Sequence, residues 1–141
     1  MIDKPEAAGT FDDPEYEEAY KVFTKRHISN LDLVPEPLLK SVIGWSKDKT
    51  VSDVRVGGSG DQFKNEGTLA GFSMIGNAKK INVRTLLIDG NREIVSDEGV
   101  RPFWREIEQV KWVTMNRSTH SPHLEEEGGC MGIISEFLIE E

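Results

Sequence analysis

The shortness of the apolar runs limits what this chain can fold into more than any other feature. The longest runs span only a few residues, such as Leu86 to Ile88, whereas a membrane-spanning helix needs about 20 apolar residues. Hydrophobic residues still make up 37% of the 141 residues, more than a disordered chain contains. We therefore expect a protein without a membrane segment that folds around one core.

The ends of the chain and its cysteine content indicate one domain in the cytoplasm. Residues 1–11 contain Pro5 and Gly9 and show little periodicity, so we expect a flexible N-terminal arm. Residues 12–141 should form a single domain, because no linker or repeat interrupts them. The N-terminus has no apolar signal segment, and one cysteine cannot form an internal disulfide, so a cytoplasmic protein is expected.

Two helices are predicted near the N-terminus. Asp13 is a suitable N-cap, Pro14 suits the first helical position, and Glu15 lies in the first turn, where the helix dipole favours acids. A second helix should run over residues 36–44, ending at Gly44. Both segments carry apolar residues at helical spacing, which predicts one buried face on each helix.

The rest of the chain is predicted to form a sheet. The Asp89-Gly90 pair lies between apolar flanks, a pattern typical of a tight hairpin. Apolar residues alternate from Met131 to Ile139, which is typical of a strand. Residues 102–115 should run from a short helix into a strand. We therefore predict an α+β fold in which N-terminal helices pack on a mostly antiparallel five- or six-stranded sheet, with strands at 50–56, 68–75, 81–88, 91–96, 110–115 and 131–140.

Acidic residues are concentrated at both ends of the chain. Residues 1–18 contain seven acids and one lysine, residues 125–141 contain six acids and no base, and the net charge of the chain is −8. Such a surface disfavours direct binding to nucleic acid and favours a basic protein partner, such as a toxin or a nucleic-acid enzyme. We predict a non-enzymatic inhibitor of the immunity-protein type, whose contact residues are Asp12, Asp13, Glu15, Glu17 and Glu18.

The segment from Arg117 to Cys130 collects most of the groups that are chemically reactive. Its two histidines flank a proline, and this spacing matches no common zinc site. We therefore expect a polar loop, no metal and no other cofactor. The alternative is a small enzyme or ligand-binding domain whose pocket is lined by this loop, with polar groups from His120, His123, Glu125 and Cys130.

No complete catalytic motif occurs in the sequence. The run from Gly57 to Asp61 lacks the Gly-Lys-Ser/Thr ending of a phosphate-binding loop, and it lacks the second glycine of a nucleophile elbow. No catalytic residue is therefore assigned, and an enzyme is the less favoured interpretation. A subunit of a larger assembly is a third alternative. The three tryptophans Trp45, Trp104 and Trp112 lie among apolar residues and are expected in the core.

Overall fold

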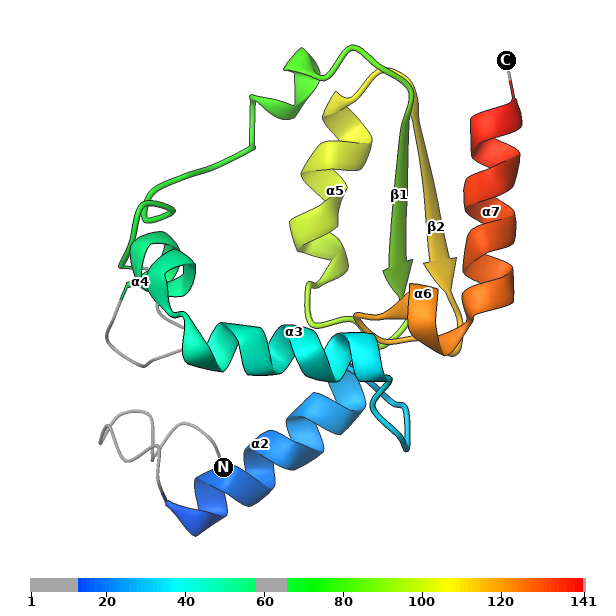
Figure 1. Ribbon diagram of the computed structural model, residues 1–141. Helices are drawn as coiled ribbons and strands as arrows, with labels where there is room; N and C mark the ends of the chain where they lie inside the picture. The colour runs from blue at the N-terminus through cyan, green and yellow to red at the C-terminus, as the bar shows by residue number, and fades with distance from the viewer. Residues whose placement is uncertain (1–12, 58–65, 141) are drawn as a thin grey trace. The chain divides into compact units, whose positions relative to one another are not determined.

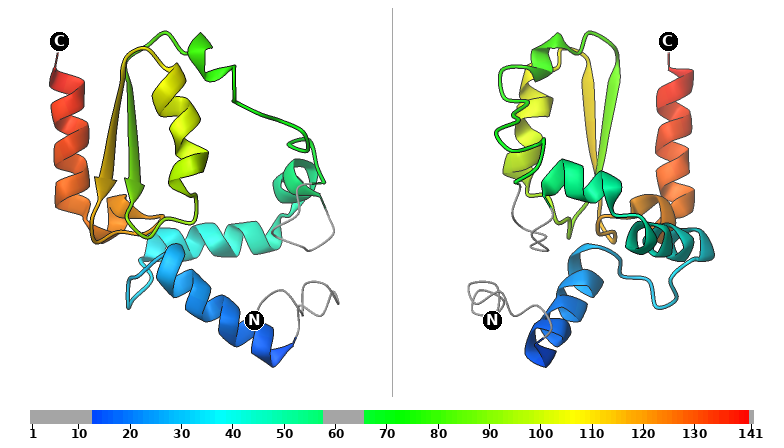
Figure 2. Two further views of the ribbon diagram at one scale, coloured as in Figure 1. Left: turned by 180° about the vertical axis from the view of Figure 1, so that it is seen from behind. Right: turned by 60° about the vertical axis from the view of Figure 1, so that its left-hand side comes forward.

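The computed structural model describes residues 13–57 and 66–140. These residues form two compact units (Figures 1 and 2). The first contains residues 13–17 and 32–73, apart from the gap at 58–65, and the second contains residues 18–31 and 74–140. The predicted arm at 1–11, and residues 58–61 of the glycine-rich run, lie outside the described residues. None of the helices described has the length and apolar character needed to span a bilayer.

Both predicted N-terminal helices are present. Helix α2 spans Pro14–His27, and Asp13 Oδ1 accepts a hydrogen bond of 2.8 Å from the backbone N–H of Glu15, as an N-cap should. Helix α3 spans Glu36–Lys47 and therefore continues three residues beyond the expected stop at Gly44. The glycine fails to end α3 because the next capping bond runs from the Asp48 N–H to the Gly44 carbonyl, as in a regular helix.

The predicted strand at 50–56 is wrong, because Thr50–Val56 forms helix α4. Asp48 Oδ1 accepts a 3.0 Å hydrogen bond from the Thr50 N–H, which starts this helix within the first unit. The chain returns against the end of α4, where the Thr68 N–H donates to the Val54 carbonyl at 2.9 Å. Contacts with the returning chain therefore accompany the helix, and they outweigh the β propensity of the valines.

The second unit contains a two-stranded parallel sheet. Strands β1 (Thr85–Gly90) and β2 (Val110–Met115) pair in register from Thr85 opposite Val110 to Gly90 opposite Met115. Helix α5 (Asp97–Glu106) connects them, because parallel strands require a long crossover between their ends. The expected helix followed by a strand at 102–115 is therefore confirmed, although α5 begins earlier.

The predicted antiparallel sheet and its hairpin are wrong. Residues 91–96 form no return strand but a turn that leads into α5. Residues 68–75 form turns rather than a strand, and η1 (Ala78–Lys80) precedes β1. The Asp-Gly pair misled the prediction because Gly90 is the last residue of β1 and serves a close backbone contact, not a hairpin turn.

The predicted C-terminal strand is also wrong. After the short helix α6 (Pro122–Glu125), Glu127–Ile139 forms helix α7. Cys130, Ile133, Ile134 and Phe137 are its least exposed residues, and they follow the i, i+3, i+4, i+7 spacing of a helix face. Figures 1 and 2 show α5 and α7 on opposite sides of the two strands.

Candidate active site

Gly90 brings the end of β1 against the segment that follows β2. A Cβ atom built at this position would lie 2.1 Å from the Thr119 carbonyl oxygen and 2.6 Å from the Ser118 carbonyl carbon. The backbone bonds across the same contact run from the Arg92 N–H to the Ser118 carbonyl and from the Asn91 N–H to the Met115 carbonyl. Only glycine allows this approach, so the two loops that follow β1 and β2 are held side by side.

Glu93 lies three residues beyond the end of β1. Its side chain is only 11% exposed, and Oε1 accepts hydrogen bonds from the backbone N–H groups of Ile94 at 2.7 Å and Val95 at 3.3 Å. These bonds hold the carboxylate in one orientation. Glu93 is not among the candidate site residues that the sequence predicted.

His120 lies five residues beyond the end of β2 and meets Glu93. Its Nδ1 atom is 2.6 Å from Glu93 Oε1, and its side chain is 52% exposed. An ionised carboxylate can only accept a hydrogen bond, so Nδ1 carries the proton. In the neutral ring, Nε2 then holds the lone pair, and it makes no hydrogen bond to any residue that the structure describes. The ring is thus oriented as a general base.

Two glutamates of α6 and its C-cap hold the backbone that leads into His120. Glu125 accepts hydrogen bonds from the Thr119 N–H at 2.5 Å and from the Thr119 hydroxyl at 2.6 Å. Glu126 accepts from the Arg117 N–H at 3.0 Å and from the Ser118 hydroxyl at 2.7 Å. Ser118 and Thr119 are fully buried. Both carboxylates therefore position the histidine through its preceding residues.

The same loop is tied to the C-terminal end of α2. The Asn30 N–H donates to Glu125 Oε1 at 2.6 Å, and the Asn30 side-chain amide donates to the Arg117 carbonyl at 2.8 Å. Ser121 Oγ donates to the Ile28 carbonyl at 3.2 Å, and His27 Nδ1 lies 3.2 Å from the Arg92 carbonyl oxygen. Residues 27–30 and both loops are thus fixed together.

Hydrogen bonding lowers the pKa of Glu126 below its ordinary value. The Ser118 hydroxyl is the largest cause, and it acts together with the backbone N–H and the guanidinium of Arg117. Each of these groups donates to the charged carboxylate or lies near it with a positive charge, so each favours ionisation. Glu126 is therefore held as a carboxylate at neutral pH.

The four polar residues of the 120–130 segment do not gather at one point. Glu125 turns to Thr119, His123 is exposed on α6 without a hydrogen bond to the described chain, and Cys130 is buried on α7. Burial raises the pKa of the Cys130 thiol, which leaves it a poor nucleophile. Within residues 13–57 and 66–140, no group of three or more His, Cys, Asp or Glu side chains is arranged to hold a metal ion.

Four of the five acids predicted to bind a basic partner lie in described residues, and Asp12 does not. Asp13 caps α2, while Glu15 and Glu17 occupy its exposed first turn. Glu18 pairs with Lys21 at 2.8 Å, with both side chains mostly exposed. These are contacts within a helix, and the binding role stays a prediction.

Comparison with known proteins relates the chain to peptidases. It is 25% identical to a proline iminopeptidase of Saccharolobus solfataricus over 138 residues, which cover 98% of this chain and 44% of the relative. It is 26% identical to a proline iminopeptidase of Heyndrickxia coagulans over 137 residues, which cover 97% of this chain and 46% of the relative. No family model matches the chain.

Solved structures give the same relation. The proline iminopeptidase of Mycobacterium smegmatis superposes with a TM-score of 0.90 at 27% identity, covering 97% of this chain and 45% of that one. VinJ superposes with a TM-score of 0.85 at 28% identity, covering 97% of this chain and 46% of that one. The chain thus matches part of an α/β-hydrolase fold and spans less than half the length of the curated relatives it matches.

These similarities overturn the predicted immunity-type inhibitor, because the similar proteins are peptidases. The inhibitor prediction rested on the acidic ends of the chain, and net charge describes the protein surface rather than the chemistry of a site. Glu93 went unassigned because its expected place was in a return strand. One sequence signal could have identified this pair: an acid, Glu93, follows one strand, and a histidine, His120, follows the next. The carboxyl ends of parallel strands share one edge of the sheet, so such residues lie close together.

Proposed function

We propose that Glu93 and His120 are the acid and the base of a hydrolytic active site. The observation that carries this proposal is the 2.6 Å distance from Glu93 Oε1 to His120 Nδ1, in a histidine whose side chain is 52% exposed. In α/β-hydrolases the acid precedes the histidine along the chain, and the nucleophile precedes both. The order of Glu93 and His120 agrees with that arrangement.

This geometry supports the following reaction. A serine or cysteine side chain that reaches Nε2 transfers its proton to His120 as it attacks a carbonyl carbon. Glu93 stabilises the imidazolium that forms and keeps its Nδ1 atom directed inward. His120 then returns the proton to the leaving amine as the C–N bond breaks. Water, deprotonated by the same imidazole, attacks the acyl-enzyme, and the proton passes back to the nucleophile as the acid product leaves. The names of the relatives indicate peptides that begin with proline as the substrate class.

The first test is hydrolysis of a fluorogenic prolyl amide by the purified protein. His120→Ala should lower the rate by about 10²–10⁴-fold, because it removes the general base. His123→Ala is the matched control, since this nearby histidine makes no hydrogen bond to the described chain. The proposal would be abandoned if the wild-type protein failed to hydrolyse the amide, or if both variants lost the same activity.

The second test examines the orientation of the His120 ring directly. Nitrogen NMR, recorded at a pH where the His120 ring is uncharged, should show the proton on its Nδ1 atom. Glu93→Ala removes the acceptor and should shift the proton population toward Nε2, whereas Glu98→Ala, an exposed acid on α5, should not. A His120 tautomer that is the same in all three proteins would contradict the assigned role of Glu93.

A further inference from the structure

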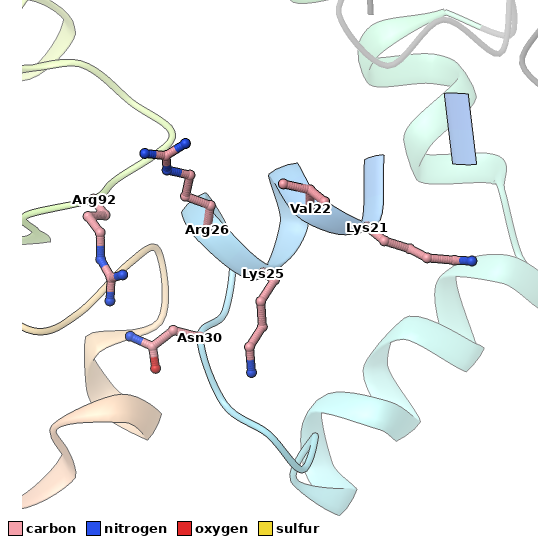
Figure 3. Close-up of a pocket in the computed structure, with 6 residues that line it drawn as sticks. All are labelled: Lys21, Val22, Lys25, Arg26, Asn30 and Arg92. Atoms are coloured by element: carbon pink, nitrogen blue, oxygen red, sulfur yellow. The ribbon is translucent and has the colours of Figure 1, made fainter. Parts of the chain in front are cut away.

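A hollow lined by basic side chains lies within the second unit. It has a volume of about 720 Å³ and is open to solvent (Figure 3). Helix α2 supplies most of its lining, and the loop after β1 supplies one arginine. We call it the basic hollow; its lining residues are Lys21, Val22, Lys25, Arg26, Asn30 and Arg92.

The lining contains four cationic side chains and no acid. This is unexpected for a chain with a net charge of −8, and residues 19–30 contain three bases and no acid. The Arg26 guanidinium has no hydrogen bond or ion pair to a described residue. The Arg92 guanidinium has only a 3.4 Å contact with the neutral Arg117 carbonyl. Two arginines from different elements thus line the same hollow without a carboxylate partner in the described chain.

The helix dipole explains only part of this arrangement. Basic residues are favourable in the last turn of a helix, which accounts for Lys25 and Arg26. Arg92 lies on a separate element, so the dipole does not account for its position. Lys25 also donates to the Leu31 carbonyl at 2.9 Å, so the end of the helix itself uses this cation.

The backbone of the basic hollow is rigidly held. Asn30 donates to Glu125, the Ile28 carbonyl accepts from Ser121, and His27 lies at hydrogen-bond distance from the Arg92 carbonyl, so the end of α2 is joined to both site loops. Arg92 is also fixed by its own N–H, which donates to the Ser118 carbonyl at 3.2 Å. Like charges that cannot separate repel one another, and a bound anion relieves that repulsion.

We propose that the basic hollow binds the phosphate group of a small molecule. A phosphate carries a charge of about −1.5 to −2 at neutral pH and three acceptor oxygens. Arg26 and Arg92 carry planar guanidinium groups that bind such oxygens in pairs. The Asn30 amide, which donates one of its two N–H groups to the Arg117 carbonyl, adds a further donor. A single carboxylate offers fewer acceptors and less charge. Figure 3 shows Lys21 extending away from the two arginines, so it contributes less.

Binding is tested with inorganic phosphate on the whole protein. Proton–nitrogen NMR spectra are recorded as phosphate replaces chloride at constant ionic strength, because surface charge effects depend on salt. We expect saturable shifts confined to the amides of Arg26, Asn30 and Arg92 and to the arginine side chains. Acetate at the same concentration should give weaker binding.

The variants Arg26→Gln and Arg92→Gln should each weaken phosphate binding by about tenfold or more, because each loses hydrogen bonds to a charged group. Arg92→Lys keeps the charge and should still weaken binding, since it loses the paired geometry. Arg55→Gln, an exposed arginine of the first unit, is the matched control and should leave binding unchanged. The spectrum without phosphate verifies that each variant is folded.

Three results would overturn the proposal. These are shifts that do not saturate, shifts spread over all basic residues, or equal losses in the Arg55→Gln control. Acetate binding as tight as phosphate would replace the phosphate assignment with a carboxylate. Binding of phosphate does not depend on the proposed hydrolysis, so failure of either proposal leaves the other standing.

Discussion

At the scale of single residues, the three consecutive glutamates at 125–127 have different roles. Glu125 and Glu126 accept hydrogen bonds from buried backbone and hydroxyl groups beside the histidine, while Glu127 is exposed in the first turn of α7. The sequence alone groups the three glutamates as one run. Only their contacts separate two positioning carboxylates from a solvated one.

The pKa of Glu126 predicts how acid affects this loop. Its carboxyl pKa is lowered in the folded chain, so its contribution to stability is complete above the ordinary carboxyl range and is lost as pH falls through the lowered value. Ser118→Ala removes the largest cause and should raise the pKa of Glu126 toward its ordinary value. Protection of the Arg117 amide from hydrogen exchange should then be lost at a higher pH.

Carbon NMR of the Glu126 carboxyl group as a function of pH measures this effect directly. Ser135→Ala, on an exposed part of α7, is the matched control and should leave the titration unchanged. If Glu126 titrated in the Ser118→Ala variant as it does in the wild type, the Ser118 hydroxyl would not be the main cause of its lowered pKa.

At the scale of elements, the candidate site depends on the contact between the end of β1 and the segment after β2. The hydrogen bond between His120 and Glu93 would lose its geometry if this approach opened, because each residue follows its strand by only a few positions. The parallel pairing of β1 and β2 delivers both loops to the same edge of the sheet. The site is therefore a property of the β1–α5–β2 unit.

Gly90→Ala tests this contact. The added Cβ would meet backbone atoms of Ser118 and Thr119, which cannot move aside as a flexible side chain can. We expect destabilisation of about 1–3 kcal/mol, together with loss of the hydrogen bond between His120 and Glu93. Urea denaturation gives the first quantity and nitrogen NMR of His120 gives the second.

Gly132→Ala provides the comparison for that experiment. Gly132 lies within α7, and a Cβ there meets nothing within 4 Å. Alanine should therefore stabilise the protein by roughly 0.5–1 kcal/mol, since glycine is unfavourable inside a helix. If Gly90→Ala behaved like Gly132→Ala, the close contact would not hold the site together.

At the scale of the whole molecule, much apolar surface remains accessible to solvent. The expectation that all three tryptophans lie in the core is wrong, since Trp45 is 68% and Trp104 is 50% exposed. Trp112 is less exposed, and its Nε1–H donates to Asp89 Oδ2 at 2.6 Å. Trp45 and Trp104 are therefore expected to be accessible to small molecules in solution.

Quenching by acrylamide, a neutral molecule unaffected by the net charge, should distinguish these tryptophans. Two variants that each keep one tryptophan are compared: one keeps Trp45 and replaces Trp104 and Trp112 with Phe, and the other keeps Trp112. Fluorescence of Trp45 should be quenched several times more efficiently than that of Trp112. Equal quenching would mean that Trp45 is covered in solution.

The sequence by itself determined where helices α2 and α3 begin and that β2 follows a helix, because capping residues and local propensity act over a few positions. It also singled out His120 as a polar candidate. Tertiary structure alone decided that residues 50–56 and 127–139 are helical, that the strands are parallel, and that Glu93 meets His120. Strand pairing and close backbone contacts join residues far apart in the chain, and no local pattern carries that information.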